Sequence, residues 1–587
     1  MVQSLLSLLG LSYSFLKFED AFPYYNPPDT VRCAIAEELA QISGVDKSSI
    51  STGLAFANTL DKGDLMLAVP RLRIKRKKPQ ELVEERAAKF PSSRLLAQPV
   101  AFNINLAFRY NPSSAAALVL PKIFELGSEY GFNPLRGVRK IADPSAGRKK
   151  VIVEFSSPKI AKEFHGNGWG VVRMNYLGDW GRHYGLLAIG WKRYGNGERF
   201  RENPIGHLYD VYVKNSADFK LEEEADKAAK KAGADQSELQ KLENQGLYRE
   251  AKAYFKSMEE GDEEALALWR QFRELSIERY KQSYAISTSI SRITAGNPRE
   301  AYLSDTMEQR PSTSKKHGDE KLVLAILRNR NGTFNYLLRD LGAAIQREQT
   351  YHFDKMIYVL MREQNVHLRR PFKILELMGG KYADMAKNMQ HVTFGEGMST
   401  RKGAVKFLGD VLADVSDAMH DIMRRNETKY SHISDPEKVA DTLGIAAMMV
   451  QDVFGKRINN YPFQLERMTS FEGDTRPYLQ YAHARELMGV DYSLLQEKLA
   501  VDLVRLMALY PDIVTQTLRT LEPCTILTYL FRLTHQLSSA YDVVKVVGAQ
   551  GGRPVTVARA ALYAAAQRVL SNRMKLLGLS PVERFVT

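Results

Sequence analysis

GRKKVIVEFSSPKIAKEFHGNGWGVVRMNYLGDWGRHYGLLAIGW, residues 147–191, contains the strands on which the predicted fold rests. Its KKVIVEF segment is short, apolar and β-branched, which predicts a buried strand, and VVRMNYLGDWG predicts a second strand that ends in a Gly-Asp-Trp-Gly turn. Two parallel strands need a crossover of about a dozen residues or more. Fifteen residues separate Phe155 from Val171. The sequence therefore predicts a parallel α/β sheet whose crossover has room only for a short helix over 159–164, too short to cover a face of the sheet.

Length and charge bound the class of protein. The chain has 587 residues, enough for several domains, and its 82 Lys and Arg against 68 Asp and Glu give a net charge of +14. A basic balance favours a polyanionic partner such as nucleic acid, although many soluble proteins without one are mildly basic too. The two cysteines, Cys33 and Cys524, suit neither a disulfide framework nor a metal site, so we expect a reducing compartment and no metal site. The apolar opening has no basic residue before Lys17 and no run approaches a bilayer span, so we expect a cytoplasmic protein without a membrane segment.

The pattern along the chain predicts three domains. Residues 1–145 read as an α+β module, with a helix over 29–44 and strands within 63–74 and 99–110. Residues 146–458 hold the parallel sheet, interrupted by a charged helical hairpin at about 220–285, a polar loop over 287–320, an Asn-Gly hairpin turn at 331–332 and a strand over 355–361. Residues 459–587 read as an antiparallel helix bundle with Pro511 and Pro523 as breakers.

Several blocks of the sequence, in the same order, resemble arginyl-tRNA synthetases of the fungal cytosolic type. They include VIVEFSSPKIAKEFH at 151–165, VVRMNYLGDWGRHYGLLAIGWKRYG at 171–195 and MSTRK at 398–402. The resemblance implies a class I synthetase: a Rossmann-like parallel-sheet catalytic domain, an N-terminal α+β module that binds the tRNA elbow and a C-terminal α-helical anticodon-binding bundle. It implies an arginine–tRNA ligase, a cytoplasmic monomer that takes arginine, tRNA and ATP with Mg²⁺ as substrates and has no tightly bound cofactor.

The resemblance also assigns an arginine site at the ends of the strands. A carboxylate pairs with a guanidinium in a fork, a tyrosine can hydrogen-bond to it or stack on its plane, and a glutamine accepts from an α-ammonium. Asp340 falls where we predict a helix to start, so it can equally be an N-cap. The matching positions are Glu154, Ser157, Tyr336, Asp340 and Gln364.

ATP and catalysis are assigned to two further motifs. MSTRK matches the mobile Lys-Met-Ser-Lys loop of class I synthetases, in which a closing ammonium stabilises the departing pyrophosphate. The resemblance therefore gives catalytic roles to Ser399, Lys402 and His165, and ATP contacts to His165, Met398 and Lys402.

Two surfaces are candidates for tRNA. On the C-terminal bundle the resemblance points to Tyr478, Tyr481 and Arg485, although two tyrosines three residues apart can also be one packed helix face. On the N-terminal module, Phe102, Phe108 and Tyr110 could stack on a base, or could belong to the core. Basic side chains that could contact phosphates lie nearby, at Arg71, Arg73, Lys75, Arg76, Lys77 and Lys78.

Three departures from the family pattern bear on activity. After His165 the chain continues with Gly166-Asn167-Gly168, so the His-x-Gly-His block and the helix with its second histidine are missing. Lys159 stands where the family has asparagine, and no Tyr-x-Gly-Glu-Ser element is found. If each lost transition-state donor costs roughly 10² to 10³ in rate, two losses cost about 10⁴ to 10⁶. A catalytically inactive tRNA-binding paralogue with a regulatory or accessory role is therefore the alternative, and omission of coding sequence would explain the missing block equally well.

Overall fold

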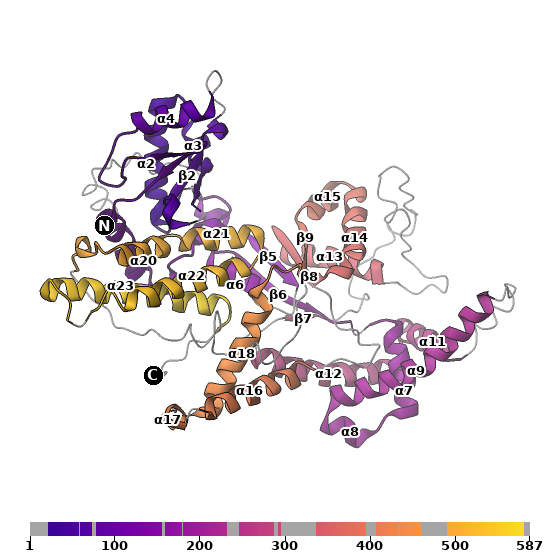
Figure 1. Ribbon diagram of the computed structural model, residues 1–587. Coiled ribbons are helices and arrows are strands. Elements are labelled where there is room, and N and C mark those ends of the chain that lie inside the picture. The colour runs from indigo at the N-terminus through magenta and orange to yellow at the C-terminus, as the bar shows by residue number, and fades with distance from the viewer. Residues whose placement is uncertain are drawn as a thin grey trace.

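The computed structural model describes residues 21–57, 59–72, 78–154, 159–178, 180–231, 246–286, 292–294, 336–394, 407–425, 427–431, 433, 435–459, 490–546 and 548–579. Figure 1 shows a central sheet, with the N-terminal module and the C-terminal helices on one side of it and a group of helices on the other. No helix in these residues is long and apolar enough to cross a membrane. Cys33 and Cys524 are both free thiols, as expected.

The N-terminal module is a four-stranded antiparallel sheet packed with helices. Its strands β1 (Leu54–Phe56), β2 (Leu65–Ala68), β3 (Val100–Phe102) and β4 (Asn105–Phe108) pair in the order β1-β2-β4-β3. Its helices are α2 (Pro27–Ser43), α3 (Lys47–Gly53), α4 (Pro79–Lys89) and α5 (Pro112–Leu126). Helix α2 ends where Gly44 adopts a left-handed conformation, which is the usual glycine stop signal.

The catalytic region is built on a five-stranded parallel sheet. Its strands are β5 (Lys150–Glu154), β6 (Gly170–Tyr176), β7 (Arg292–Thr294), β8 (Lys355–Met361) and β9 (Met389–Phe394), in the order β7-β6-β5-β8-β9. All four strand pairs are parallel, with Val151 opposite both Val171 and Lys355. The strands predicted at 149–155, 171–176 and 355–361 are therefore confirmed by β5, β6 and β8; β5 is the apolar run that the parallel sheet buries on both faces, whereas most side chains of β6 are half-buried.

Two sets of helices cover the two faces of this sheet. One face packs Ile152, Met174 and Met356 against α13 (Tyr336–Tyr351), α14 (Asn365–Met378) and α15 (Gly380–Lys387). The opposite face packs Val151, Val153 and Ile357 against the short crossover helix α6 (Lys159–Gly166) and against Leu521, at the end of α21 (Tyr510–Thr520). The predicted short helix is thus present, and the C-terminal bundle supplies the cover that α6 alone cannot give.

Helices follow β6 along the chain before the insertion predicted at about 220–285. After β6 come α7 (Arg182–Tyr194), α8 (Gly197–Glu202), α9 (Pro204–Lys231), α11 (Gly246–Glu260) and α12 (Glu263–Ile286). Trp180 of the Gly-Asp-Trp-Gly turn packs edge-on against Trp269, with ring centroids 5.2 Å apart, and joins a cluster of aromatic side chains from α7, α8, α11 and α12. The prediction is based on a run of charged residues. The first turns of α9 pack on α7 instead of facing solvent, so a pattern of charges does not mark where this helix begins.

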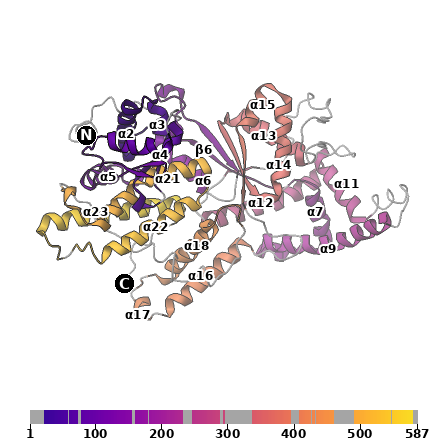
Figure 2. The ribbon, with the colours of Figure 1, turned by 45° about the horizontal axis from the view of Figure 1, so that its top comes forward.

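The C-terminal helices and the N-terminal module share one hydrophobic core. The bundle comprises α20 (Lys498–Ala508), α21, α22 (Cys524–Tyr541) and α23 (Gly552–Leu576), preceded by α16 (Leu408–Arg424), α17 (Glu427–Tyr430) and α18 (Pro436–Phe454). Helices α16–α18 thus lie before residue 459, where the sequence predicts the bundle to begin. One cluster of buried side chains runs from Val31 to Tyr130 and from Met449 to Leu579. Figures 1 and 2 show α20–α23 beside the module in both views.

Candidate arginine site at the carboxyl edge of the sheet

The strand order places a crevice between β5 and β8. Strand β5 is followed by a connection to β6 on one side, and β8 by a connection to β9 on the other, so the order reverses between them. In open parallel sheets, ligands bind outside the carboxyl ends of the strands at this switch point. Glu154 is the last residue of β5, and Arg362–Gln364 form a 3₁₀ turn directly after β8.

The Glu154 carboxylate is paired with an arginine side chain of the protein itself. Arg347 of α13 forms an ion pair with it, Nη1 to Oε2 at 2.5 Å, and both side chains are at most 8% exposed. The guanidinium also donates to the Tyr358 hydroxyl at 3.4 Å and lies 4.9 Å from the centroid of the Tyr176 ring. Burial raises the pKa of Glu154, and the guanidinium beside it opposes that rise. A carboxylate that is paired in this way adds no net charge to the pocket and is not an open ligand site.

Asp340 is the carboxylate that stays accessible. It lies seven residues before Arg347, two turns along the same face of α13, and its side chain is 24% exposed. The imidazole Nε2 of His367 on α14 lies 2.5 Å from Asp340 Oδ2, and the His367 ring is 4.8 Å from the ring of Tyr336, centroid to centroid. The interpretation of Asp340 as an N-cap is wrong, because α13 begins at Tyr336 and Asp340 lies in its second turn.

The other predicted arginine contacts lie around this pair as far as they are described. Tyr336 is 63% exposed at the first residue of α13, and Gln364 is half-buried at the end of the turn after β8. With Glu154 and Asp340, the described candidates are two carboxylates, an open aromatic ring and an amide. That set suits a ligand with a guanidinium at one end and an ammonium at the other. Ser157 lies outside the described residues.

His165 is not brought to this crevice. It is exposed at the carboxyl end of α6, next to the turn that leads into Gly170, the first residue of β6. Glu154 lies at the other end of the neighbouring strand β5: Lys150 pairs with Gly170, and the four residue steps from Lys150 to Glu154 span about 13 Å at a strand rise of about 3.3 Å per residue. The cause is the short crossover: the eight-residue α6 leads directly back to the amino end of β6, and the crossover contains no second helix. Ser399, Lys402 and Met398 lie outside the described residues.

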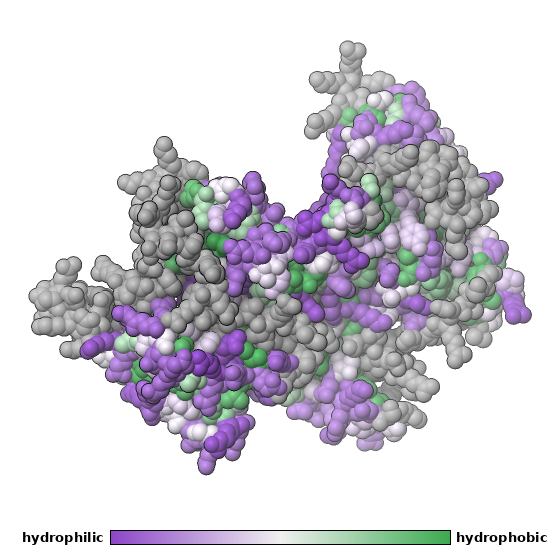
Figure 3. Space-filling view, turned by 180° about the vertical axis from the view of Figure 1, so that it is seen from behind, coloured by the Kyte–Doolittle hydropathy of each residue, from purple (hydrophilic) through white to green (hydrophobic). Residues whose placement is uncertain are grey.

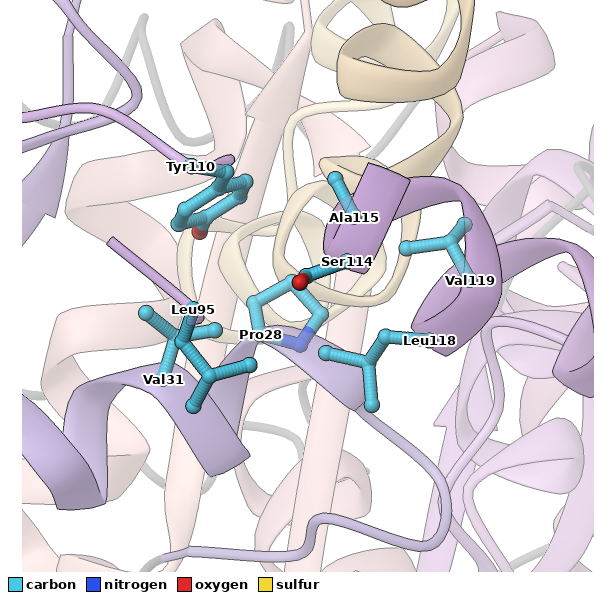
Figure 4. Close-up of a pocket in the computed structure, with 8 residues that line it drawn as sticks. All are labelled: Pro28, Val31, Leu95, Tyr110, Ser114, Ala115, Leu118 and Val119. Atoms are coloured by element: carbon cyan, nitrogen blue, oxygen red, sulfur yellow. The ribbon is translucent and has the colours of Figure 1, made fainter. Parts of the chain in front are cut away.

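The residues proposed to contact tRNA differ in how far their side chains are exposed. Phe102, at the end of β3, is 40% exposed, whereas Phe108 is fully buried and Tyr110 is 8% exposed. Figure 4 shows Tyr110 at a small, mostly apolar pocket inside the module, among Pro28, Val31, Leu95, Ser114, Ala115, Leu118 and Val119. Stacking by Phe108 or Tyr110 is therefore wrong, because both rings belong to the module's core. Arg71 and Lys78 are exposed, whereas residues 73–77 and the bundle residues Tyr478, Tyr481 and Arg485 lie outside the described residues.

Arg347 and His367 contact the candidate residues Glu154 and Asp340, and sequence reasoning missed both. Arg347 could have been found from its helical spacing to Asp340, since i and i+7 share a helix face. His367 offers no such signal, because it reaches Asp340 from a different helix across 27 residues of sequence.

Comparisons with known proteins agree with this architecture. The family described as "tRNA synthetases class I (R), catalytic domain" matches residues 135–465, and the "DALR anticodon binding domain" matches residues 479–585. The cytoplasmic arginine–tRNA ligase of Saccharomyces cerevisiae is 44% identical over an alignment of 614 residues, which covers 96% of each chain. That alignment is longer than the 587-residue chain, so the yeast enzyme has residues without a counterpart here. The probable cytoplasmic arginine–tRNA ligase of Schizosaccharomyces pombe is 42% identical and covers 99% of this chain and 98% of its own.

Solved structures show the same fold. The arginyl-tRNA synthetase of Plasmodium falciparum superposes with a TM-score of 0.68 and that of Thermus thermophilus with 0.66, each at 17% identity over 94% of this chain and 99% of the other. The match of the catalytic family over more than half of the chain, together with relatives above 40% identity along nearly all of it, settles the relationship. The chain belongs to the arginine–tRNA ligase family of class I aminoacyl-tRNA synthetases.

Proposed function

We propose that the chain activates L-arginine with ATP and transfers it to tRNA, as an arginine–tRNA ligase. The observation that carries the proposal is the accessible Asp340 carboxylate at the β5–β8 switch point, with the second carboxylate of that crevice already neutralised by Arg347. One open negative charge suits one guanidinium. In the first step the arginine carboxylate attacks the α-phosphate of ATP and pyrophosphate leaves. In the second a ribose hydroxyl of tRNA attacks the acyl carbon and AMP leaves.

The described residues support a division of labour in the arginine site. Asp340 accepts two hydrogen bonds from the guanidinium, the open ring of Tyr336 lies on its plane, and Gln364 accepts from the α-ammonium. Glu154 is held and neutralised by Arg347 behind the site, and Ser157 is proposed to contact the substrate where the chain leaves β5.

The ATP site is proposed on the 394–410 segment. Ser399 and Lys402 would stabilise the departing pyrophosphate, and Met398 would contact the nucleotide. Mg²⁺ would arrive with ATP as part of the substrate. Within the part of the chain that the structure describes, no group of three acidic, histidine or cysteine side chains is placed for a metal ion. His165 is left out of the proposed site, because it lies at the opposite edge of the sheet.

A tRNA partner is supported by charge and by shape. The net charge of +14 favours a polyanion. Figure 3 shows the surface hollowed between the N-terminal module and the α13–α15 side of the sheet, with a largely hydrophilic floor where it is described. We propose that Phe102 stacks on a base at the module and that Tyr478, Tyr481 and Arg485 serve the anticodon. A cytoplasmic location and a monomeric state remain predictions; relatives from both cytoplasm and mitochondria are similar to this chain.

Arginine-dependent exchange of pyrophosphate into ATP tests the activity directly. We expect exchange by the full chain, and at least a ~100-fold rise in the KM for arginine on Asp340→Asn, because the guanidinium then loses the charged group that accepts its hydrogen bonds. Asp384→Asn, on the exposed surface of α15, is the control and should leave the KM unchanged. Absence of exchange by the unaltered chain would reject the proposal.

The eight-residue α6 favours the second candidate, a tRNA-binding paralogue without aminoacylation. It leaves no helix amino terminus after His165 to face the ATP phosphates. Retained binding of tRNA together with absent exchange would select this candidate. Sequencing the transcript across 164–169 shows whether the expressed protein lacks the block or whether the block was only omitted from the coding sequence.

A further inference from the structure

The Asp340 carboxylate is held by a side chain from another helix. His367 lies at the third position of α14, and its Nε2 is 2.5 Å from Asp340 Oδ2. The imidazole is 18% exposed and packs against the ring of Tyr336 at 4.8 Å. This contact bridges α13 and α14, the two helices whose amino-terminal turns border the switch point.

The bond leaves the carboxylate able to bind a ligand. Each carboxylate oxygen has two lone-pair sites, so Oδ2 can accept from His367 on one and from a guanidinium on the other, while Oδ1 stays open. A donor at Oδ2 fixes the rotamer of Asp340, so that a fork of two N–H groups meets both oxygens without reorganisation.

Other charges near Asp340 are already committed. Arg347 is paired with Glu154 and also contacts Tyr358, and the ring of Tyr176 lies beneath its guanidinium. The described contacts of Arg347 go to Glu154, Tyr358 and Tyr176 and none to Asp340, so the described contact that can orient Asp340 is the one from α14.

We propose that His367 is a specificity-determining positioning residue: it holds Asp340 in the rotamer that receives the guanidinium of the substrate. The proposal rests on the proposed function and deepens it. His367 acts through Asp340 and does not touch the reacting carboxylate or phosphate, so it should affect the choice and binding of the amino acid and leave the chemical step alone.

Three substitutions in the full chain test the role. His367→Leu removes the donor at similar volume, His367→Gln keeps an N–H at the reach of Nε2, and Asp340→Asn removes the charge that is held. His352→Asn is the control: this histidine lies just beyond the other end of α13, is 74% exposed, and has a φ of 48° that asparagine tolerates. Binding of L-arginine and of its neutral analogue L-citrulline is measured by calorimetry, alongside KM and kcat for arginine in pyrophosphate exchange.

We expect His367→Leu to weaken arginine binding ~10-fold to ~100-fold, as for loss of a hydrogen bond to a charged group, with kcat within about 2-fold. Discrimination against citrulline should fall in parallel, and His367→Gln should restore both to within about 3-fold. With Asp340→Asn already present, adding His367→Leu should cost nothing more, because the two residues act as one unit.

Equal loss in the Leu and Gln variants, unchanged binding in the Leu variant, or additive effects with Asp340→Asn would each overturn the role of His367 while the ligase function stands. If the unaltered chain binds no arginine, the proposed function fails, and the role of His367 fails with it.

Discussion

Glu163 is a buried acid that the fold leaves without a partner. It lies on α6 with 1% of its surface exposed, and neither carboxylate oxygen has a hydrogen-bond partner among the described residues. Burial raises its pKa well above the usual range. Below the unfolded-state pKa of about 4.3, such an acid is protonated in both states and does not lower the free energy of unfolding. Above that pH the unfolded chain ionises while the folded chain resists, so stability falls as pH rises towards the folded pKa.

We predict that Glu163→Gln makes the protein more stable than the unaltered chain at pH 8, by about 1.4 kcal/mol for each unit of the pKa shift that it removes. The advantage should shrink towards pH 5, which urea unfolding at the two pH values would measure. Glu202→Gln, on the exposed last residue of α8, should show no such pH dependence. An advantage of the same size at both pH values would mean that Glu163 is not protonated in the folded protein.

The pairing of Arg347 with Glu154 shows how a substrate-like contact forms inside the protein. The resemblance assigned Glu154 to the substrate arginine, and the structure gives it an arginine from α13 instead. A carboxylate at the end of a buried strand cannot remain unpaired without a large desolvation cost, so an internal cation is the expected solution.

At the scale of elements, the turn after α6 determines whether the short crossover can close. Gly168 has a φ of +79°, and a Cβ built there would lie 2.1 Å from the carbonyl oxygen of Pro134. Asn167 fixes the same turn by accepting from the backbone N–H of Asn133 at 3.3 Å. The strand–helix–strand unit therefore closes because backbone approaches backbone at a position without a side chain.

Gly168→Ala should destabilise the protein by the sum of two costs: about 1–2 kcal/mol for a left-handed alanine and about 1–3 kcal/mol for the clash. Gly147→Ala is the matched variant, since Gly147 has a φ of +75° and a methyl group added there would meet nothing within 4 Å, so it should show the first cost alone. Denaturant midpoints measure the difference; equal effects of the two substitutions would show that the Pro134 contact relaxes freely.

At the scale of the whole molecule, buried ion pairs join the N-terminal module to the C-terminal bundle. Arg505 of α20 pairs with Asp64 of the module and donates to the carbonyl oxygen of Leu60 at 2.8 Å. Arg32 of α2 pairs with Asp512 of α21. Because the two parts also share one core, we infer that they unfold together.

Arg505→Met should cost roughly 3–5 kcal/mol, because it leaves the Asp64 carboxylate buried without its cation. Limited proteolysis should then cleave the module and the bundle faster and to the same extent. Lys89→Met, at an exposed i,i+4 pair on α4, should change neither rate. Faster cleavage of the module alone would show that the two parts unfold independently.

Local elements of this protein can be read from its sequence without a structure. Alternating and β-branched apolar runs predicted β5, β6 and β8, glycine and proline marked the ends of helices, and the motif order predicted the family. Such signals come from neighbours within a few residues, which is why they are legible in the chain itself. The family resemblance assigned Asp340 and Glu154 to the substrate arginine, and that assignment stays a prediction.

The covering of the sheet and the pairing of charges emerged only in three dimensions. Leu521 comes to the sheet face behind α6 from 357 residues beyond Phe164 in the sequence, and Arg347 and His367 reach the site from helices whose own patterns show only an amphipathic face. Burial then separated Phe102 from Phe108 and Tyr110, three aromatic residues that look alike in the sequence. The physical reason is that packing and charge pairing are fixed by distances between elements, and these distances depend on the whole chain at once.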